Sequence, residues 1–194
     1  GCACCWWRAV YRAEAPALYD RYRELVRSGF DGASAVVAPT ISAWDMIEEE
    51  HGGHDVVYVV PHGLRTETPL SDPKLPFFIA AARRWDEAKN VELLRKVAGD
   101  LLWPVRIAGD TEDSAARQST AKLGWLGDLD LPPLLRWMRS ASVFLHPARY
   151  EPFGLTALEA ALSGCALVLA DLPSLREIWG GAALYFSPDS PGEL

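Results

Sequence analysis

Short apolar runs alternate with amphipathic stretches along most of the chain. Each run is too short for a buried helix and is bounded by Gly, Pro, Asp or Ser, a pattern that predicts β-strands. Seven runs of this kind occur, at residues 34–40, 55–61, 75–81, 103–109, 141–147, 165–171 and 182–188.

Between these runs the apolar residues recur at helical spacing. The periodicity is plain over residues 18–26, 91–101 and 134–141, and the last stretch follows Pro132 and Pro133, which suit the first turn of a helix. Strand and helix in regular alternation predict an α/β fold with a doubly wound parallel sheet.

One segment has the composition of a crossing between domains. The stretch "VVPHGLRTETPLSDPKLP", residues 59–76, carries four prolines, a glycine and several polar residues between two predicted strands. We therefore expect residues 1–60 to be the remnant of one α/β domain and residues 61–75 to be the crossing. Residues 76–194 then form a second domain that is incomplete at its end.

Composition and charge narrow the function classes. The chain has 194 residues and a net charge of -7, so it lacks the basic surplus that broad binding of nucleic acid requires. The sequence shows neither a signal peptide nor an apolar run of membrane-spanning length. We expect a cytoplasmic protein, with peripheral attachment to the inner membrane through a preceding segment as the alternative.

The cysteines and histidines give a weak signal. Cys2, Cys4 and Cys5 crowd together without the second half of a zinc site, and Cys165 lies alone in an apolar run. We expect reduced thiols. The sequence "HGGHD", with His51 and His54, is expected to be a solvated turn.

Basic side chains come directly after one predicted strand, and a helix preceded by a glycine comes after another. Arg83, Arg84 and Lys89 come after the strand at 75–81, whereas Gly154 comes after the strand at 141–147. Ligands of doubly wound sheets bind at the carboxyl ends of the strands, and a helix N-terminus offers unbonded N–H groups. Taken singly, the cations would be read as surface charges. Together with the helix, they predict a site for a diphosphate.

Glu159 is an unexpected residue in its helix. The sequence "LTALEAAL" is otherwise almost wholly apolar, and a carboxylate in a core-facing helix is costly unless a ligand or partner binds it.

Two motifs carry a family resemblance. "ARRWDEAKN" and "EPFGLTALEAALSG", the second with two glutamates in E-x7-E spacing, resemble the C-terminal half of the family 4 retaining glycosyltransferases (group 1). These enzymes have the two-domain GT-B architecture with Rossmann-like domains. The likeness covers roughly residues 35–194. The chain departs from the family pattern at His62, where asparagine is usual, and next to Arg84, where glycine usually precedes the arginine.

The resemblance implies a role for each candidate residue. Glu159 would hold the ribose hydroxyls of a nucleotide-sugar donor, and Glu151 would face the donor sugar near the reacting carbon. Arg84 and Lys89 would neutralise the leaving diphosphate in place of a metal ion, with no cofactor. Backbone amides would bind sugar and phosphate at Phe153, Gly154, Leu155 and Thr156.

The function implied is transfer of a hexose, with retention and without metal, to an acceptor hydroxyl on a carbohydrate or lipid-linked acceptor. Bacterial polysaccharide biosynthesis is the expected setting. This chain alone is expected to be inactive, because the acceptor side would lie in a missing first half. A nucleotide-sugar epimerase of the same architecture and a non-catalytic nucleotide-sugar-binding fragment are the alternatives.

Three weaker signals have competing interpretations. Asp128 and Asp130 match the D-x-D pattern of metal-dependent transferases, but Asp130 directly precedes a predicted helix and suits its N-terminus. Trp125 either lines a base pocket or, as we favour, belongs to the core. Glu177, after a predicted strand, is a further candidate for the cleft.

Overall fold

The computed structural model describes residues 2–64, 72–83, 85–109 and 120–194. The chain divides into two compact units. The first comprises Gly1–Gly63, Tyr150–Phe153 and Leu172–Gly180, and the second comprises Leu64–Arg149, Gly154–Asp171 and Gly181–Leu194.

The second unit is built on a six-stranded parallel sheet in the order β5-β4-β3-β6-β7-β8. Its strands are β3 (Leu75–Ala81), β4 (Val105–Ala108), β5 (Leu123–Gly127), β6 (Ala141–His146), β7 (Ala166–Ala170) and β8 (Leu184–Phe186). Its helices are α4 (Val91–Val97), α5 (Leu131–Ser140) and α6 (Leu155–Leu162), with 3-10 turns η2 (Glu87–Lys89), η3 (Gly180–Ala182, which begins in the first unit) and η4 (Pro191–Glu193).

The strand order confirms the predicted Rossmann-like, doubly wound α/β fold. Counted from β3, the order is 3-2-1-4-5-6, in which the connections reverse direction between β3 and β6. These two strands pair in parallel, with Phe78 opposite Val143 and Ile79 opposite Phe144. The carboxyl ends of β3 and β6 therefore meet at the topological switch point, where such sheets bind their ligands.

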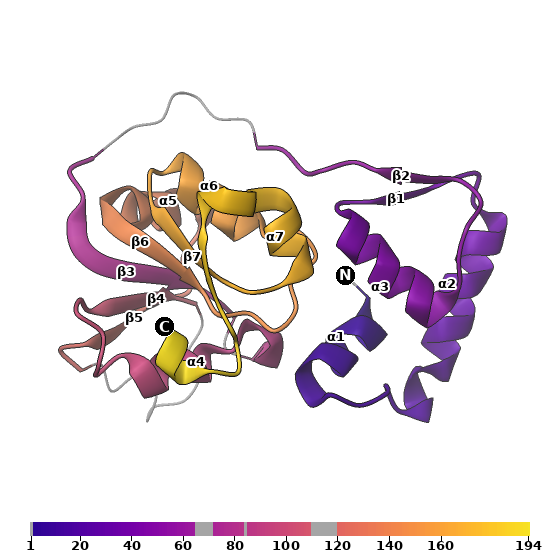
Figure 1. Ribbon diagram of the computed structural model, residues 1–194, viewed down its shortest axis with the longest axis horizontal. Coiled ribbons are helices and arrows are strands. Elements are labelled where there is room, and N and C mark those ends of the chain that lie inside the picture. Colours follow the sequence, from indigo (N-terminus) through magenta and orange to yellow (C-terminus); the bar gives the residue numbers. More distant parts are fainter. Residues whose placement is uncertain (1, 65–71, 84, 110–119) are drawn as a thin grey trace. The chain divides into compact units, whose positions relative to one another are not determined.

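Helices cover both faces of this sheet (Figure 1), which explains why its strands are nearly continuous apolar runs. On one face, the ring of Phe77 lies 5.8 Å from that of Trp137 in α5. On the other, Ala80 belongs to a core cluster with Val91 and Leu94 of α4.

The edge strand β5 was not among the predicted strands. It pairs with β4 in parallel, with Leu123 opposite Val105 and Trp125 opposite Ile107. Its sequence "LGWLG" carries two glycines, which weaken the apolar pattern by which a strand is found.

The first unit contains helices and a small parallel sheet. Its elements are α1 (Ala3–Tyr11), η1 (Ala17–Tyr19), α2 (Asp20–Gly32), β1 (Val36–Ala38), α3 (Ile41–His51), β2 (Val57–Val59) and α7 (Pro173–Trp179). Strands β1 and β2 pair with Val36 opposite Val57. All seven predicted strand runs thus contain a strand.

Glu177 of α7 has a structural role in this unit. Its carboxylate accepts hydrogen bonds from the backbone amides of Ile41 (2.8 Å) and Ser42 (3.0 Å) at the start of α3. Burial acts to raise the pKa of Glu177, but the hydrogen bonds from Ser42 and Ile41 outweigh it, and the net pKa is lowered. The carboxylate of Glu177 therefore holds the start of α3, and its place in the cleft stays a prediction.

The two units do not correspond to two continuous stretches of sequence, as one domain boundary would give. The first boundary, after Gly63, falls within the predicted crossing of residues 61–75, of which residues 65–71 lie outside the described part. Two later segments also group with the first unit. Leu172–Gly180 does so because α7 packs on α3, and Tyr150–Phe153 is hydrogen-bonded to Cys2 and Thr40. The assignment of residues 1–60 to an acceptor-side domain stays a prediction. Among the described helices, none is both long and apolar enough to cross a bilayer.

Candidate functional site

A pocket of about 260 Å³ opens at the switch point of the second unit. We call it the switch-point pocket. It is lined by Ala81, Ala82, Arg83, Lys89, Ala108, Gly109, Asp128, Leu129, Leu134 and Thr156. These residues lie at or after the carboxyl ends of β3, β4 and β5 or belong to the starts of α5 and α6. Chain segments far apart in sequence therefore contribute a cation and a helix N-terminus to one pocket.

Gly109 allows the ends of β3 and β4 to approach each other closely. A Cβ atom at this position would lie 1.9 Å from the carbonyl oxygen of Ala82. The approach is held by a backbone hydrogen bond from Ala82 N to Ala108 O (2.9 Å), and Gly109 N donates on its other side to Gly127 O at the end of β5 (2.8 Å). The floor of the pocket thus depends on the absence of a side chain here.

Asn90 fixes the segment that carries Lys89. It adopts the left-handed conformation, with φ of 52°, directly after the turn η2. Its side-chain amide donates to the carbonyl oxygens of Pro147 and Pro188, both at 2.9 Å, and its carbonyl accepts from Arg149. Asn90 therefore ties the loop after β3 to the loop after β6, which was not foreseen from the sequence.

We expect Asn90→Ala to lower the free energy of unfolding by about 2–3 kcal/mol, because two carbonyls lose their donors and alanine disfavours the left-handed conformation. Urea unfolding followed by circular dichroism measures the change. Glu92→Gln, which removes only the exposed pair with Arg95 at 3.7 Å, is the control and should change stability by less than about 0.5 kcal/mol. Equal, small effects of both variants would contradict a positioning role for Asn90.

Helix α6 begins as the sequence predicts. Gly154 is its N-cap in the left-handed conformation, with φ of 92°. The amides of Ala157 and Leu158 already donate to Gly154 O, whereas those of Leu155 and Thr156 donate to none of the described residues. Since Thr156 lines the switch-point pocket, the amino end of α6 offers N–H groups and a positive dipole end to an anion there.

Glu159 lies in the middle of α6 and is partly buried. Burial raises the pKa of its carboxyl group, and no opposing charge or donor within the described residues lowers it. The carboxylate is thus desolvated and forms neither a hydrogen bond nor an ion pair with that part of the chain. It is not among the residues that line the switch-point pocket. An acid placed in this way destabilises the fold and remains available as a hydrogen-bond acceptor.

We expect Glu159→Gln to raise the melting temperature at pH 7. Because the pKa of Glu159 is higher in the folded state than in the unfolded one, the folded state loses stability as pH rises through these values. The gain from the glutamine should therefore vanish as pH falls below about 4, where the carboxyl group is protonated in both states. Differential scanning fluorimetry across this pH range makes the test. A lower melting temperature for the variant at pH 7 would show that Glu159 has a stabilising partner.

Two other candidate residues, Glu151 and Phe153, are not among the described residues that line the switch-point pocket. Glu151 lies in the loop before α6 as predicted, and Phe153 N donates to its Oε1 at 3.5 Å. Both residues group with the first unit, where the ring of Phe153 lies 4.9 Å from that of His62. Arg84 lies outside the described residues.

Comparison with known proteins identifies the family. Residues 76–194, more than half of the chain, match the family model described as Glycosyl transferases group 1. The chain belongs to this family. One relative is the O-antigen chain mannosyltransferase B of Escherichia coli, 31% identical over 116 residues, which are 60% of this chain and 25% of that protein. The chain therefore spans about a quarter of the length of this relative.

Solved structures show the same fold. Sucrose-phosphate synthase from Thermosynechococcus elongatus superposes with a TM-score of 0.77 at 17% identity, over 95% of this chain and 53% of that one. Anabaena HepE, solved in complex with UDP and glucose, gives a TM-score of 0.76 at 16% identity, over 89% of this chain and 55% of that one. The second unit of this group 1 glycosyltransferase chain thus has the architecture of GT-B proteins.

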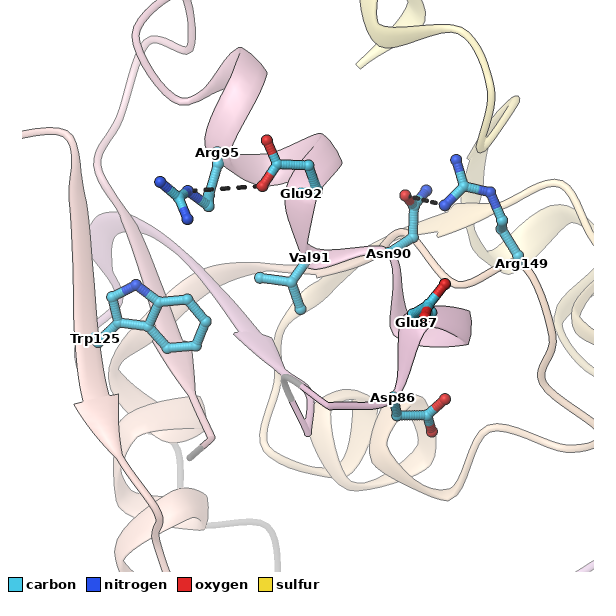
Figure 2. A pocket seen from close by; sticks show the side chains of 8 residues that line it. All are labelled: Asp86, Glu87, Asn90, Val91, Glu92, Arg95, Trp125 and Arg149. Atoms are coloured by element: carbon cyan, nitrogen blue, oxygen red, sulfur yellow. Dashed lines mark hydrogen bonds and ion pairs between the residues drawn. The ribbon is translucent and has the colours of Figure 1, made fainter. Parts of the chain in front are cut away.

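A second pocket of about 250 Å³ lies beside α4 in the same unit (Figure 2). In this pocket Arg95 lies 3.7 Å from Glu92, and Arg149 contacts Asn90 and Asp189. Of the candidate residues named from the sequence, Trp125 lines it, whereas Lys89, Thr156 and Glu159 do not. Because Lys89 and the N-terminus of α6 both contribute to the switch-point pocket, that pocket is the better candidate for an anionic ligand.

The structure also shows the surroundings of Trp125 and of the two D-x-D aspartates, Asp128 and Asp130. Trp125 packs against the core cluster, as favoured from the sequence, and its other side faces the second pocket. Asp128 lines the switch-point pocket, whereas Asp130 is the N-cap position of α5 without a capping hydrogen bond from its side chain. The predicted helix start after Asp130 is confirmed.

Proposed function

We propose that this chain is the donor-binding part of a glycosyltransferase that moves a hexose from a nucleoside-diphosphate sugar to an acceptor hydroxyl. One observation carries the proposal: Lys89 and Thr156, from segments that follow β3 and β6, line one pocket at the switch point. An ammonium group and a helix N-terminus together suit a diphosphate.

The diphosphate is the leaving group, so negative charge develops on it as the glycosidic bond breaks. Lys89, Arg84 and the amides at the start of α6 stabilise that charge. These groups serve in place of a metal ion, and no cofactor is required. Asp128 in the same pocket is the residue that a metal-dependent alternative would use.

Binding of the nucleoside and the sugar is assigned to the E-x7-E motif. The carboxylate of Glu159, which has no partner among the described residues, accepts hydrogen bonds from the two ribose hydroxyls, and these compensate for its desolvation in the free protein. Glu151 faces the donor sugar, and the amides from Phe153 to Thr156 bind sugar hydroxyl and distal phosphate. Transfer proceeds with retention: the acceptor oxygen bonds the anomeric carbon on the face that the diphosphate leaves, and its proton passes to the leaving phosphate oxygen.

The relatives suggest the class of acceptor. The name of the Escherichia coli relative refers to mannosyl transfer in O-antigen chain synthesis, and the HepE structure contains UDP and glucose. By extension, we propose a hexose donor and a carbohydrate or lipid-linked acceptor in a bacterial polysaccharide pathway. The site of action is cytoplasmic or peripheral to the inner membrane.

A thermal-shift panel of UDP, GDP, ADP and their sugar conjugates tests this function on the chain as it stands. At least one diphosphate should raise the melting temperature by an amount that grows with the logarithm of its concentration, while the parent nucleoside has a much smaller effect. The shift should persist in EDTA. A shift that appears only with manganese would assign the site to a metal held by Asp128. The absence of any shift across the panel would overturn the proposal.

A further inference from the structure

Three potential metal ligands converge in the first unit. Cys2 is the N-cap of α1, Cys4 lies in the first turn of that helix, and His51 is the last residue of α3. Their ligand atoms all lie within 4.8 Å of one another. The expectation of a solvated turn at His51 was therefore wrong, because its ring is buried against α1. The imidazole adds a third potential metal ligand to the two cysteines.

The spacing of these atoms fits a tetrahedral zinc site after small adjustments. With Zn–S and Zn–N bonds of about 2.3 and 2.0 Å, tetrahedral ligand atoms lie about 3.4–3.8 Å apart. The Sγ of Cys2 and the Nε2 of His51 are 3.0 Å apart, and the other pairs lie within the 4.8 Å limit. Shifts of the ligand atoms by less than about 1.5 Å would bring them to tetrahedral spacing. Rotations about the side-chain bonds are enough for such shifts.

The cluster is closed to solvent, as structural metal sites are. Cys2, Cys4 and His51 are 5%, 0% and 3% exposed. The Sγ of Cys2 accepts a hydrogen bond from the Cys5 amide at 3.3 Å. The Nδ1 of His51 bonds none of the described residues, so Cys2 alone among them orients the ring through a hydrogen bond.

The charged side chains around the cluster do not by themselves neutralise two cysteine thiolates. Arg8 and Arg23 lie near the cluster, but each donates at 2.7 Å to the carboxylate of Glu50, which is 5% exposed in its side chain. The two guanidinium groups are therefore occupied by a buried acid. Two anionic thiolates at Cys2 and Cys4 would be unfavourable beside each other in a buried cluster. A divalent ion would compensate both thiolates at once.

We propose that Cys2, Cys4 and His51 bind a zinc ion that fastens α1 to the end of α3. Two thiolates and an imidazole are the ligands that zinc prefers over magnesium or calcium. The hydroxyl of Tyr22 accepts from Ala3 N at 3.3 Å, beside the cluster, and is a candidate for the fourth position. This ion is structural and separate from the donor chemistry proposed for the second unit.

Cobalt(II) titration of the reduced, metal-free chain tests the proposal. One equivalent of Co²⁺ should bind and give thiolate-to-cobalt charge-transfer absorption in the near ultraviolet, with the visible bands of a tetrahedral site. Zn²⁺ should displace it stoichiometrically. Cys4→Ser and His51→Ala should each weaken binding by about 100-fold or more, since loss of a direct ligand costs at least as much as loss of an outer hydrogen-bond partner.

The control is Cys165→Ser, which removes a buried thiol of the second unit and should leave the titration unchanged. If a ligand variant fails to fold, the intensity of the charge-transfer band in the unaltered chain still decides, because it reports two thiolates. Absence of stoichiometric Co²⁺ binding, octahedral spectra, or equal loss in Cys165→Ser would overturn the proposal.

Discussion

Replacing Lys89 by alanine is expected to weaken binding of a nucleoside diphosphate to this chain by about 10- to 100-fold, because a charge-assisted hydrogen bond contributes about 1.5–3 kcal/mol. Binding of the parent nucleoside should change much less, since the base and ribose contacts do not involve the ammonium group. Arg84→Ala is expected to act in the same way. Isothermal titration calorimetry with diphosphate and nucleoside side by side measures the difference.

Lys96→Ala is the matched control. Lys96 is an exposed cation in the last turn of α4 and does not line the switch-point pocket. Its loss removes the same net charge from the same unit, so it corrects for long-range electrostatics. If Lys89→Ala weakened nucleoside and diphosphate equally, or if Lys96→Ala had the same effect, the assignment of Lys89 to the diphosphate would fail.

A methyl group at Gly109 is expected to have the largest effect on stability. In Gly109→Ala the new Cβ would meet the Ala82 carbonyl oxygen at 1.9 Å, in a backbone conformation, φ of 155°, that alanine rarely adopts. The ends of β3 and β4 must then separate, which disturbs the hydrogen bonds at Ala82 N and Gly109 N. We expect a loss of about 3 kcal/mol or more, or a fall in melting temperature of about 6–12 °C, together with loss of diphosphate binding.

Gly99→Ala tests whether this effect is specific to the pocket. Gly99 follows α4, and a Cβ there would meet nothing within 4 Å. Stability should change by less than about 0.5 kcal/mol, and diphosphate binding should be unaffected. A Gly109→Ala variant as stable as Gly99→Ala would show that the two strand ends need not approach so closely.

The sequence predicted those features of the fold that depend on local pattern. Apolar runs located seven of the strands, and Gly154 before "LTALEAAL" located the start of α6. The convergence of Lys89 and Thr156 was also predictable, because the parallel doubly wound topology brings the strands before them together.

Features that depend on tertiary contacts were not predicted. The bonds of Asn90 reach Pro147 and Pro188, 57 and 98 residues away, so no local pattern shows them; an asparagine just before a helix was the only available signal. His51 was misjudged for the same reason, since its partner Cys2 is 49 residues away on another helix. Tertiary packing decided these positions.

A crystal structure of the chain with a bound nucleoside diphosphate tests the central claim most directly. We predict that the diphosphate lies in the switch-point pocket between the ammonium group of Lys89 and the amide of Thr156, with the ribose hydroxyls on the carboxylate of Glu159 and no metal ion on the phosphates. A diphosphate bound instead in the second pocket, against Arg95 and Trp125, or a ribose remote from Glu159, would contradict the claim.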